Sequence, residues 1–513
     1  MKYGVVIAGI PEGHPLYIRR WLTDVLVNLD TEVRQLLCIQ SIHTKWAILK
    51  QSIAARINHI LRSLPPSILQ ETNFINRFNM IMKCFLADLV KVDPTFIEDH
   101  SFKIAQLPPE SGGGGLRFAE VAAISAFVAS VTSSLPQIMK AYPEVEGIIH
   151  RQINNIQQVD DIPEILKEYF HSIEVLKEAG SMISSNTPVS LQGLSEMKQK
   201  DFKGLQKRLM QYTAAIRLEE IRTQLSQIQP YHWLLVKQLT AGATPESAAI
   251  FNIVPRSYHH MGNNEMFGIL RRRFLIKDPE IYQSLKCKCG QNLDPYGWHL
   301  QKCAKFSKYR IRTHEEVKDV IARILHTAKV PFASEFCPFK DKEDQNYKRL
   351  DLVLSNSRSI YPATNRGKGL IDVTIGNPVR EVTGWLNNDY RDHMQQATTI
   401  AHIGTKIEED KRRKYQQLAD SHSMEFIPMG FESQGSWGPN THVVFEALMQ
   451  RIGDRNNPDR VSKHTKSHYW RQQISFTIHK YVSRHIEDAF ASINLKTIQS
   501  ITTPPNYEAF QTP

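Results

Sequence analysis

The sequence predicts an α+β protein, with a helical N-terminal half followed by a small zinc-binding segment and an α/β domain. Apolar residues recur at helical spacing through the first half of the chain. A short central segment concentrates cysteine and histidine, and two apolar runs typical of β-strands follow it. The 513 residues leave room for about three or four hydrophobic cores.

Composition and net charge exclude several classes of protein. With 41% hydrophobic and 22% charged residues, the composition excludes a disordered chain, a collagen and a membrane bundle. The 63 Lys and Arg against 52 Asp and Glu give a net charge of +11, which favours a polyanionic partner such as nucleic acid or an acidic membrane surface. Six cysteines are too few for a disulfide scaffold, and no apolar run reaches the roughly 18–20 residues of a membrane span. We therefore expect an intracellular, soluble protein.

The N-terminal half is predicted to be mostly helical. From Leu22 to Lys91 the apolar spacing is helical, with a break at Pro65-Pro66. The four glycines at 112–115 interrupt the pattern before a further helix at 119–135. These glycines lack the spacing of a phosphate-binding loop, so a turn or packing role is favoured.

Residues 142–225 also show helical spacing, interrupted by polar loops. The stretch 184–194 is predicted to be an exposed connector. Near Gln229 the pattern changes to mixed strands and helices, and we place the main domain boundary there.

Three thiols and one imidazole lie close together in the sequence. They follow the pattern C-x-C-x9-H-x3-C, and they are Cys287, Cys289, His299 and Cys303. Three thiolates and an imidazole complete the tetrahedral shell of a Zn²⁺ ion, and a filled shell is typical of a structural site. The alternative is three reduced thiols beside an unrelated histidine.

An amphipathic helix is predicted directly after the cluster. Thr313 and Glu316 form a capping-box pattern at its start. The apolar stripe that follows consists of Val317, Val320, Ile321, Ile324, Leu325 and Ala328. Pro331 ends the helix, and two β-type runs come next, 349–354 and 370–375, each with an aspartate at its centre.

The two strand aspartates, Asp351 and Asp372, suggest a shared divalent metal ion. A carboxylate within an apolar strand is costly to bury unless it is paired or binds a cation. Glu335, just after the helix, is a candidate third oxygen ligand. Ion pairs with lysines such as Lys348 and Lys368 are the alternative.

Basic residues supply the remaining candidate contacts. Lys411 and Lys414 lie one turn apart on a predicted charged helix, where either could orient a water or stabilise a phosphorane charge. A solvated face is the more common meaning of such a run. The candidate nucleic-acid contacts are Arg271, Arg272, Arg273, Lys305, Lys308, Arg310 and Arg312. For the three consecutive arginines, coverage of a helix surface is an equal alternative.

The order of these motifs resembles the restriction-like endonuclease of non-LTR retrotransposons. The resemblance covers roughly residues 251–491. It consists of the cysteine-histidine cluster, a helix, the strand ending Leu352-Val353-Leu354, the run Gly369-Leu370-Ile371-Asp372-Val373-Thr374, the Lys414-Tyr415 helix, the segment 431–438 and the segment 469–473. The resemblance implies a PD-(D/E)XK fold, in which Asp351 and Asp372 bind Mg²⁺ or Mn²⁺ and a lysine assists the attacking water. This chain departs from the general pattern, because Leu350 replaces a proline and Thr374 occupies the usual lysine position.

The first half is similar to the post-palm part of the same reverse transcriptase-like polyprotein, through 4–13 and 112–117. The resemblance implies a thumb and connecting helices without a palm, so no reverse transcriptase activity is expected. The only aspartate pair near the expected motif, Asp160-Asp161, follows Val159 and Gln158 and lies in a polar helical stretch, so it is rejected as the polymerase site.

The implied domains follow one another along the chain. They are a thumb-like helical remnant at 1–140, a helical connector at 141–229, a helical segment with the zinc cluster at 230–310, the endonuclease domain at 311–450, and C-terminal basic helices and a tail at 451–513.

The leading hypothesis is a metal-dependent DNA endonuclease that nicks its target for reverse transcription. DNA is the expected partner, with RNA or an RNA–DNA hybrid as a further one, and the expected location is nuclear. No membrane and no small-molecule substrate are expected. The alternatives are a catalytically inactive nucleic-acid-binding remnant and a helical interaction scaffold that uses zinc only for folding.

Overall fold

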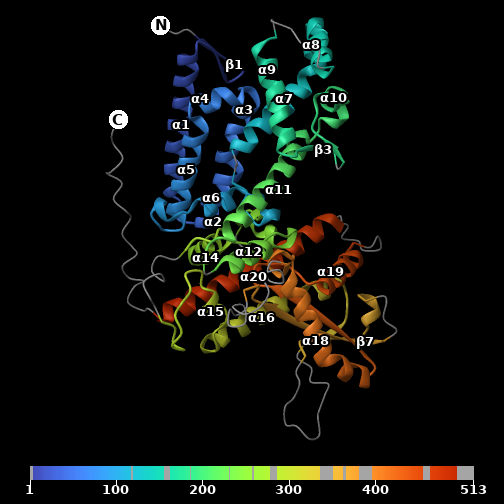
Figure 1. Cartoon of the computed structure of the whole chain (residues 1–513). Coiled ribbons are helices and arrows are strands. Elements are labelled where there is room, and N and C mark those ends of the chain that lie inside the picture. The colour runs from blue at the N-terminus through green and yellow to red at the C-terminus, as the bar shows by residue number, and fades with distance from the viewer. Residues whose placement is uncertain are drawn as a thin grey trace. The chain divides into compact units, whose positions relative to one another are not determined.

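A computed structural model gives the fold of the chain as two compact units, Met1–His232 and Trp233–Pro513 (Figure 1). The structure describes residues 4–116, 119–154, 162–184, 186–229, 231–256, 259–277, 286–334, 350–361, 366–379, 395–453 and 463–493.

The N-terminal unit is built from helices and two short hairpins. Its elements are β1 Gly4–Ile7, β2 Ile10–Gly13, α1 Pro15–Leu37, α2 Ile42–Ile48, α3 Ala54–Ser63, α4 Pro66–Glu71, α5 Phe74–Leu89, α6 Asp99–Gln106, α7 Ala119–Ala141, α8 Pro143–Ile153, α9 Glu164–Glu178, β3 Met182–Ser184, β4 Thr187–Pro188, α10 Leu191–Ser195 and α11 Leu205–Leu225. A π-helical segment, Leu49–Ile53, joins α2 to α3.

The helices predicted for the N-terminal half are confirmed. The break predicted at the proline pair lies between α3 and α4, where Pro66 takes the first position of α4. The glycine run forms a tight turn before α7, with φ of +89° at Gly112 and +78° at Gly115. A Cβ on Gly113 would lie 2.1 Å from the carbonyl oxygen of Leu107, so this backbone approach requires glycine.

The stretch 184–194, predicted to be an exposed connector, is exposed at 184, 186–188 and 192 but also has regular structure and two buried residues. It contains β4 and the start of α10, and β3 pairs antiparallel with β4. Val189 and Leu194 are each 1% exposed and pack in the same core as α7 and α9. The two buried side chains, with the half-buried Leu191, anchor this segment to the core.

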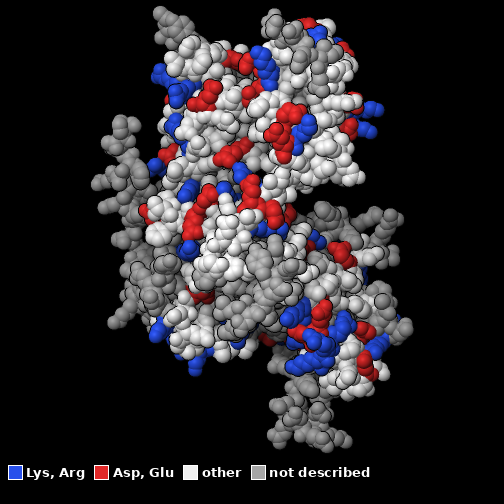
Figure 2. Space-filling model, in the orientation of Figure 1, with Lys and Arg blue, Asp and Glu red and all other residues white. Residues whose placement is uncertain are grey.

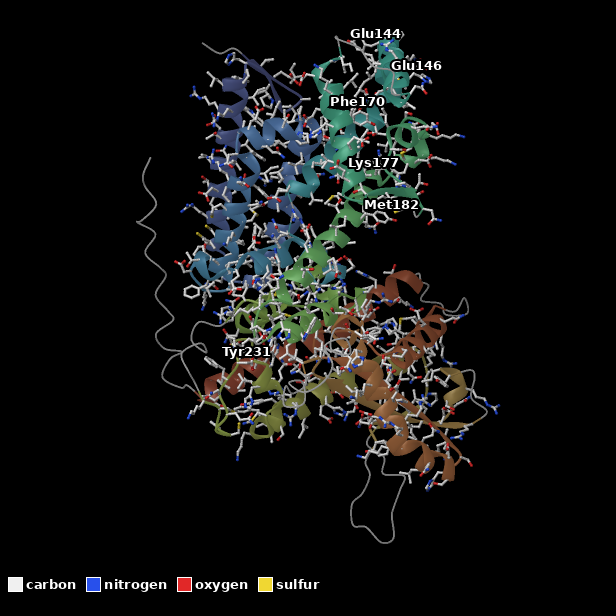
Figure 3. All side chains as sticks on the ribbon, viewed as in Figure 1. Glu144, Glu146, Phe170, Lys177, Met182 and Tyr231 are labelled. Atoms are coloured by element: carbon white, nitrogen blue, oxygen red, sulfur yellow. The ribbon has the colours of Figure 1, made fainter. Side chains whose placement is uncertain are left out.

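Helix α7 is the most apolar helix of the described residues. By length and composition it could span a membrane, but half of its most apolar window is buried inside the protein. Phe127, Val128 and Leu135 pack in a core with residues of α8, α9 and α11. In the first turn of α8, Glu144 and Glu146 project outward (Figure 3). Acidic side chains at a helix N-terminus interact favourably with the helix dipole.

The C-terminal unit combines helices with one four-stranded sheet. Its elements are α12 His232–Ala241, α13 Pro245–Ala248, α14 Asn263–Arg273, α15 Trp298–Lys302, α16 Ser307–Thr327, β5 Phe332–Ser334, β6 Leu352–Leu354, β7 Lys368–Gly376, α18 His402–Ser421, β8 Met424–Glu432, α19 Pro439–Ile452 and α20 Lys463–Ile493. The strand order is β5-β6-β7-β8, with β7 and β8 parallel and the other pairs antiparallel.

Side-chain alternation gives the sheet two covered faces. On one face, Ile371 and Val373 of β7 pack with the apolar residues of α16, α19 and α20. On the other face, Leu370 packs with Ala419 of α18 and Phe426 of β8. Figure 1 shows α18 beside β7. The unit is therefore a layered α/β structure, which agrees with the coarse α+β prediction.

Two local predictions in this unit are wrong. The predicted capping box does not form, because α16 already begins at Ser307 and the Thr313 hydroxyl donates to the carbonyl of Tyr309 within the helix, at 3.0 Å. The apolar stripe of this helix is buried as predicted. Asp351 lies just before β6 rather than at the centre of a strand, whereas Asp372 is in the middle of β7.

Candidate metal centre and acidic site

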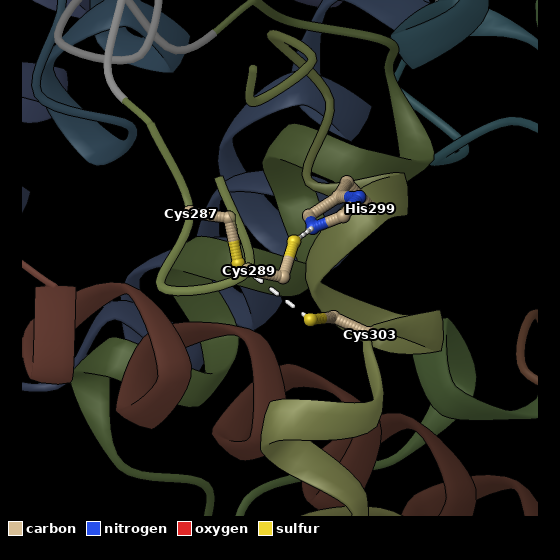
Figure 4. A group of neighbouring side chains, drawn as sticks. All are labelled: Cys287, Cys289, His299 and Cys303. Carbon is tan, nitrogen blue, oxygen red and sulfur yellow. Dashed lines mark hydrogen bonds between the residues drawn. The ribbon is translucent and has the colours of Figure 1, made fainter. Parts of the chain in front are cut away.

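The cysteine-histidine cluster comes together in space (Figure 4). One ligand atom from each of Cys287, Cys289, His299 and Cys303 lies within 4.8 Å of all the others. The two Sγ atoms of Cys287 and Cys303 are 3.6 Å apart, and the Sγ of Cys289 is 3.2 Å from Nε2 of His299. A tetrahedron with Zn–S bonds of about 2.3 Å has edges of about 3.7 Å, so this donor set is consistent with a structural zinc site.

Local turns position the four ligands. The backbone N–H of Gly290 donates to the carbonyl of Cys287, and the φ of Gly290 is +89°, which favours glycine. The carboxylate of Asp294 accepts the N–H groups of Tyr296, Trp298 and His299 at 2.7–3.0 Å. Asp294 thereby caps the start of α15, which carries His299 and leads to Cys303.

The electrostatics of the thiols suit a bound cation. Burial raises the pKa of Cys287 to about 12. The pKa of Cys289 is lowered, chiefly by a backbone hydrogen bond at Gln291. A buried neutral thiol is converted to a thiolate when a metal ion supplies the compensating charge. Within the described residues, Cys287, Cys289, His299 and Cys303 form the group of metal-ligating side chains that lie close enough together to hold one ion.

Asp372 forms an ion pair with α18. Its carboxylate oxygens are 2.9 and 3.2 Å from Nζ of Lys411, and Oδ2 also accepts the Thr374 hydroxyl at 3.0 Å. The Asp372 side chain is 8% exposed. Lys414 instead places its ammonium 5.0 Å from the ring centroid of Tyr415 and is exposed. Of the two candidate lysines, the fold therefore brings Lys411 to the acid.

Asp351 is held by the neighbouring strand and by α16. Its Oδ2 accepts the N–H of Val373 at 2.7 Å and lies 3.1 Å from Nε2 of His314. This hydrogen bond raises the pKa of His314. The ladder between β6 and β7 ends at the pair Leu352 and Ile371, so Asp351 lies one residue beyond the last paired position. Its partner His314 is on α16, whereas the partner of Asp372, Lys411, is on α18.

Sequence reasoning missed His314. It lies in α16 beside a long apolar stripe, and only the tertiary contact of this helix with the sheet brings it to Asp351. Glu335, the candidate third acid, lies outside the described residues.

Two glycines set the close approach of α18 to the sheet. A Cβ on Gly430 of β8 would lie 2.5 Å from the carbonyl oxygen of Gly404 in α18. Two buried glutamates then fix this helix: Glu432 Oε1 accepts the N–H groups of Ile403 and Gly404 at 2.9 and 3.1 Å. Glu408 of α18 accepts N–H groups of Gly430, Asn440 and Thr441 at 2.9–3.0 Å. Lys411 is thus presented by a rigidly held helix.

The predicted nucleic-acid contacts divide into two groups. Arg272 and Arg273 are 6% and 3% exposed, and Arg273 donates to the Ser247 hydroxyl at 2.7 Å. Burial lowers the pKa of Arg272 to about 10. Arg271 is half-buried, with its guanidinium 4.2 Å from the Phe267 ring centroid. These arginines pack within the unit, which agrees with the alternative that they cover a helix.

The other four basic residues are at the surface. Lys305, in the turn before α16, and Lys308, Arg310 and Arg312, in its first two turns, are all exposed. Lys308 and Arg312 are four residues apart and lie on one face of the helix. Figure 2 shows further Lys and Arg side chains gathered over the region of α18, with acidic side chains among them.

Comparison of the sequence with family models and with curated proteins gives no match. The functional argument therefore rests on the geometry of these residues.

Proposed function

We propose that the C-terminal unit is a metal-dependent DNA endonuclease of the non-LTR retrotransposon type. The observation that carries the proposal is the ion pair between Asp372 of β7 and Lys411 of α18, at 2.9 Å. An acid on a central strand with a lysine beside it is the arrangement that the resemblance implies.

Each side chain has a role in this proposal. Asp351 and Asp372 would hold Mg²⁺ or Mn²⁺, and the bound ion supplies Lewis-acid polarisation of the phosphoryl oxygen and a water of lowered pKa. Lys411, with 29% of its side chain exposed, can donate to the attacking water or to the charged phosphorane. Oxygen ligands suit this ion, and the two aspartates supply them.

The remaining features support substrate binding and folding. Lys308 and Arg312 would contact the phosphate backbone, because both are exposed on one helix face. The cysteine-histidine cluster would hold Zn²⁺ and tie α15 to the loop before it.

A nicking assay tests the proposal. The full chain is incubated with supercoiled plasmid and Mg²⁺ or Mn²⁺, and wild type is compared with the Asp351→Ala/Asp372→Ala double variant. We expect cleavage by wild type and its loss in the double variant. Asp319→Ala, an exposed aspartate of α16, is the matched control and should cleave like wild type. Equal cleavage by wild type and the double variant refutes the proposal.

One observation favours a second candidate, a nucleic-acid-binding protein without catalysis. The hydrogen bonds of Asp351 to Val373 and His314 satisfy this carboxylate without a metal ion. On this candidate, DNA binding weakens with salt while no metal-dependent cleavage occurs.

A further inference from the structure

A cavity of about 480 Å³ lies in the C-terminal unit on the α16 and α20 side of the sheet. It opens where the parallel strands β7 and β8 end, and it is lined there by Gly376, the last residue of β7, and by Ser433, the residue after β8. The N–H of Ser433 donates to the carbonyl of Gly376 at 2.8 Å, which holds the two strand ends together. Crevices beyond the carboxyl ends of parallel strands are common ligand sites, and this volume falls within the range of about 300–1,000 Å³ found for small-molecule pockets.

The inner wall carries buried polar atoms that have no hydrogen-bond partner in the described part of the chain. They are Nε2 of Gln301, Nδ2 of Asn377, Oγ of Ser433 and Nε2 of His485. Three of these residues, Gln301, Ser433 and His485, are only 4–5% exposed. A buried polar atom without a partner costs about 1–3 kcal/mol, so four of them around one cavity indicate that a polar ligand or water completes them.

The orientation of these groups is defined by their other bonds. Asn377 accepts the N–H of Val379 through Oδ1, at 2.9 Å, so its amide nitrogen is the donor left for the cavity. His485 has a hydrogen bond with the backbone of Leu300, and burial lowers its pKa to about 4. The imidazole is therefore neutral at physiological pH, and Nε2 is an acceptor. The wall thus offers two amide donors, one acceptor and one hydroxyl that serves as either.

The charge of the lining favours an anion. Among the described residues, Lys302 and Arg310 are the charged residues that line the cavity, and no described carboxylate lines it. Arg310 is oriented by donating to the carbonyl of Cys303 at 3.0 Å. Apolar walls come from Ile375, Val379 and Val482.

We propose that this cavity binds a nucleotide. The phosphate would meet Lys302 and Arg310, the base edge would use the amide, hydroxyl and imidazole groups, and the apolar walls would pack against the base or sugar. A base edge carries both donors and acceptors, which matches the mixed set on the wall better than a simple anion does. The proposal does not depend on nuclease activity. The nucleotide is either a free nucleoside monophosphate or an unpaired nucleotide of a strand.

Binding to the full chain is measured by calorimetry without added Mg²⁺ or Mn²⁺. The probes are the four ribonucleoside 5′-monophosphates, ribose 5-phosphate and a short single-stranded DNA oligonucleotide. We expect at least one monophosphate to bind at one site per chain and more tightly than ribose 5-phosphate. If the oligonucleotide binds at the same site and is displaced by the monophosphate, an unpaired nucleotide of a strand is the ligand; if only the monophosphate binds, a free nucleotide is.

Three variants assign the binding to the cavity. Gln301→Met removes the side-chain amide and Ser433→Ala removes one hydroxyl, both with little change of volume, and Lys302→Met removes one charge. Each should weaken binding about ten-fold. Arg323→Met, an exposed cation on α16 outside the cavity, is the matched control and should bind like wild type.

The Ser433→Ala variant should unfold at the same Tm as wild type, because it deletes a hydroxyl that has no hydrogen-bond partner among the described residues.

Several results overturn the proposal. Binding that is unchanged in all three variants places the nucleotide elsewhere. Ribose 5-phosphate binding as tightly as every monophosphate removes the role of the base. An absence of binding of every probe to the folded wild-type chain means that the polar atoms are satisfied by water alone.

Discussion

Cys287 shows at the scale of one residue what the zinc cluster does for the chain. A thiol with a pKa of about 12 is neutral at physiological pH, and it lies 3.6 Å from a second buried thiol, Cys303. Such a pair contributes little to stability by itself. A bound Zn²⁺ converts both groups to thiolates and joins the turn that carries Cys287 to the end of α15 at Cys303.

Removal of one ligand should therefore abolish metal binding. We expect Cys303→Ser to reduce the zinc content from about one ion per chain to near zero and to lower the Tm. The matched control is Cys38→Ser, an exposed free cysteine of the N-terminal unit. The measurement is atomic absorption on the purified chain together with thermal unfolding. Because zinc displaces thiol protons, its apparent affinity should also rise with pH. A chain that keeps its zinc and its Tm without Cys303 would contradict a structural zinc site.

The residue scale also shows what could be predicted for the acidic site. Asp372 stands out because a charged residue interrupts the apolar run 370–375, and such a residue needs a partner. Its partner, Lys411, is 39 residues away, and sequence alone left Lys411 and Lys414 equal. The packing of α18 on β7 brings Lys411 rather than Lys414 to Asp372, and this packing is a tertiary contact that the local sequence does not encode.

At the scale of elements, α18 depends on a carboxylate that is buried at its N-terminus. Glu432 is 1% exposed, and burial raises its pKa to about 7, although the two N–H groups that it accepts lower it. Its Oε2 has no hydrogen-bond partner among the described residues. No sequence pattern marks this cap, because Glu432 lies on β8, 28 residues after the helix N–H that it accepts at Gly404.

This cap predicts a pH dependence of stability. The folded chain holds the Glu432 proton more tightly than the unfolded chain, so stability falls as the pH rises from about 4.5 to about 7. At pH 8 the cost is roughly 3 kcal/mol, because burial raises the pKa of Glu432 from 4.5 to about 7. Glu432→Gln stays neutral and keeps a carbonyl acceptor, so the variant should be more stable than wild type near pH 8 and about equal to it near pH 4.5.

Urea unfolding at several pH values measures this difference. Two buried histidines act in the opposite direction: burial lowers the pKa of His479 to about 3 and that of His485 to about 4, so their contribution is lost as the pH falls below about 6.5. Wild type and variant share this pH dependence from the two histidines, so it cancels when their free energies of unfolding are compared at the same pH. A Glu432→Gln chain that is destabilised equally at every pH would show that the carboxylate is not strained by burial.

At the scale of the whole molecule, long periodic helices and the cysteine-histidine cluster were predictable from the sequence. The helical spacing of apolar residues and the spacing of the Cys and His ligands are local properties of the sequence, so they do not depend on how distant segments pack. The prediction of a capping box at Thr313 was wrong because α16 begins earlier, at Ser307. The residues between Ser307 and Thr313 are mostly polar and show no helical spacing of apolar residues. The burial of Arg272 and Arg273 was not predictable, because long cationic side chains cover apolar surface as readily as they face solvent.

The whole account depends on the claim that the sheet of the C-terminal unit carries a nuclease site at Asp372 and Lys411. Single-turnover nicking of supercoiled DNA with Mg²⁺, by Lys411→Met and Lys414→Met chains, tests this claim most directly. The two variants lose the same charge from the same helix, so their net charge and nonspecific DNA affinity match. We predict that Lys411→Met slows nicking by about 100-fold or more, while Lys414→Met stays within a few-fold of wild type. Equal nicking rates for the two variants, or no nicking by the wild-type chain, would contradict the account.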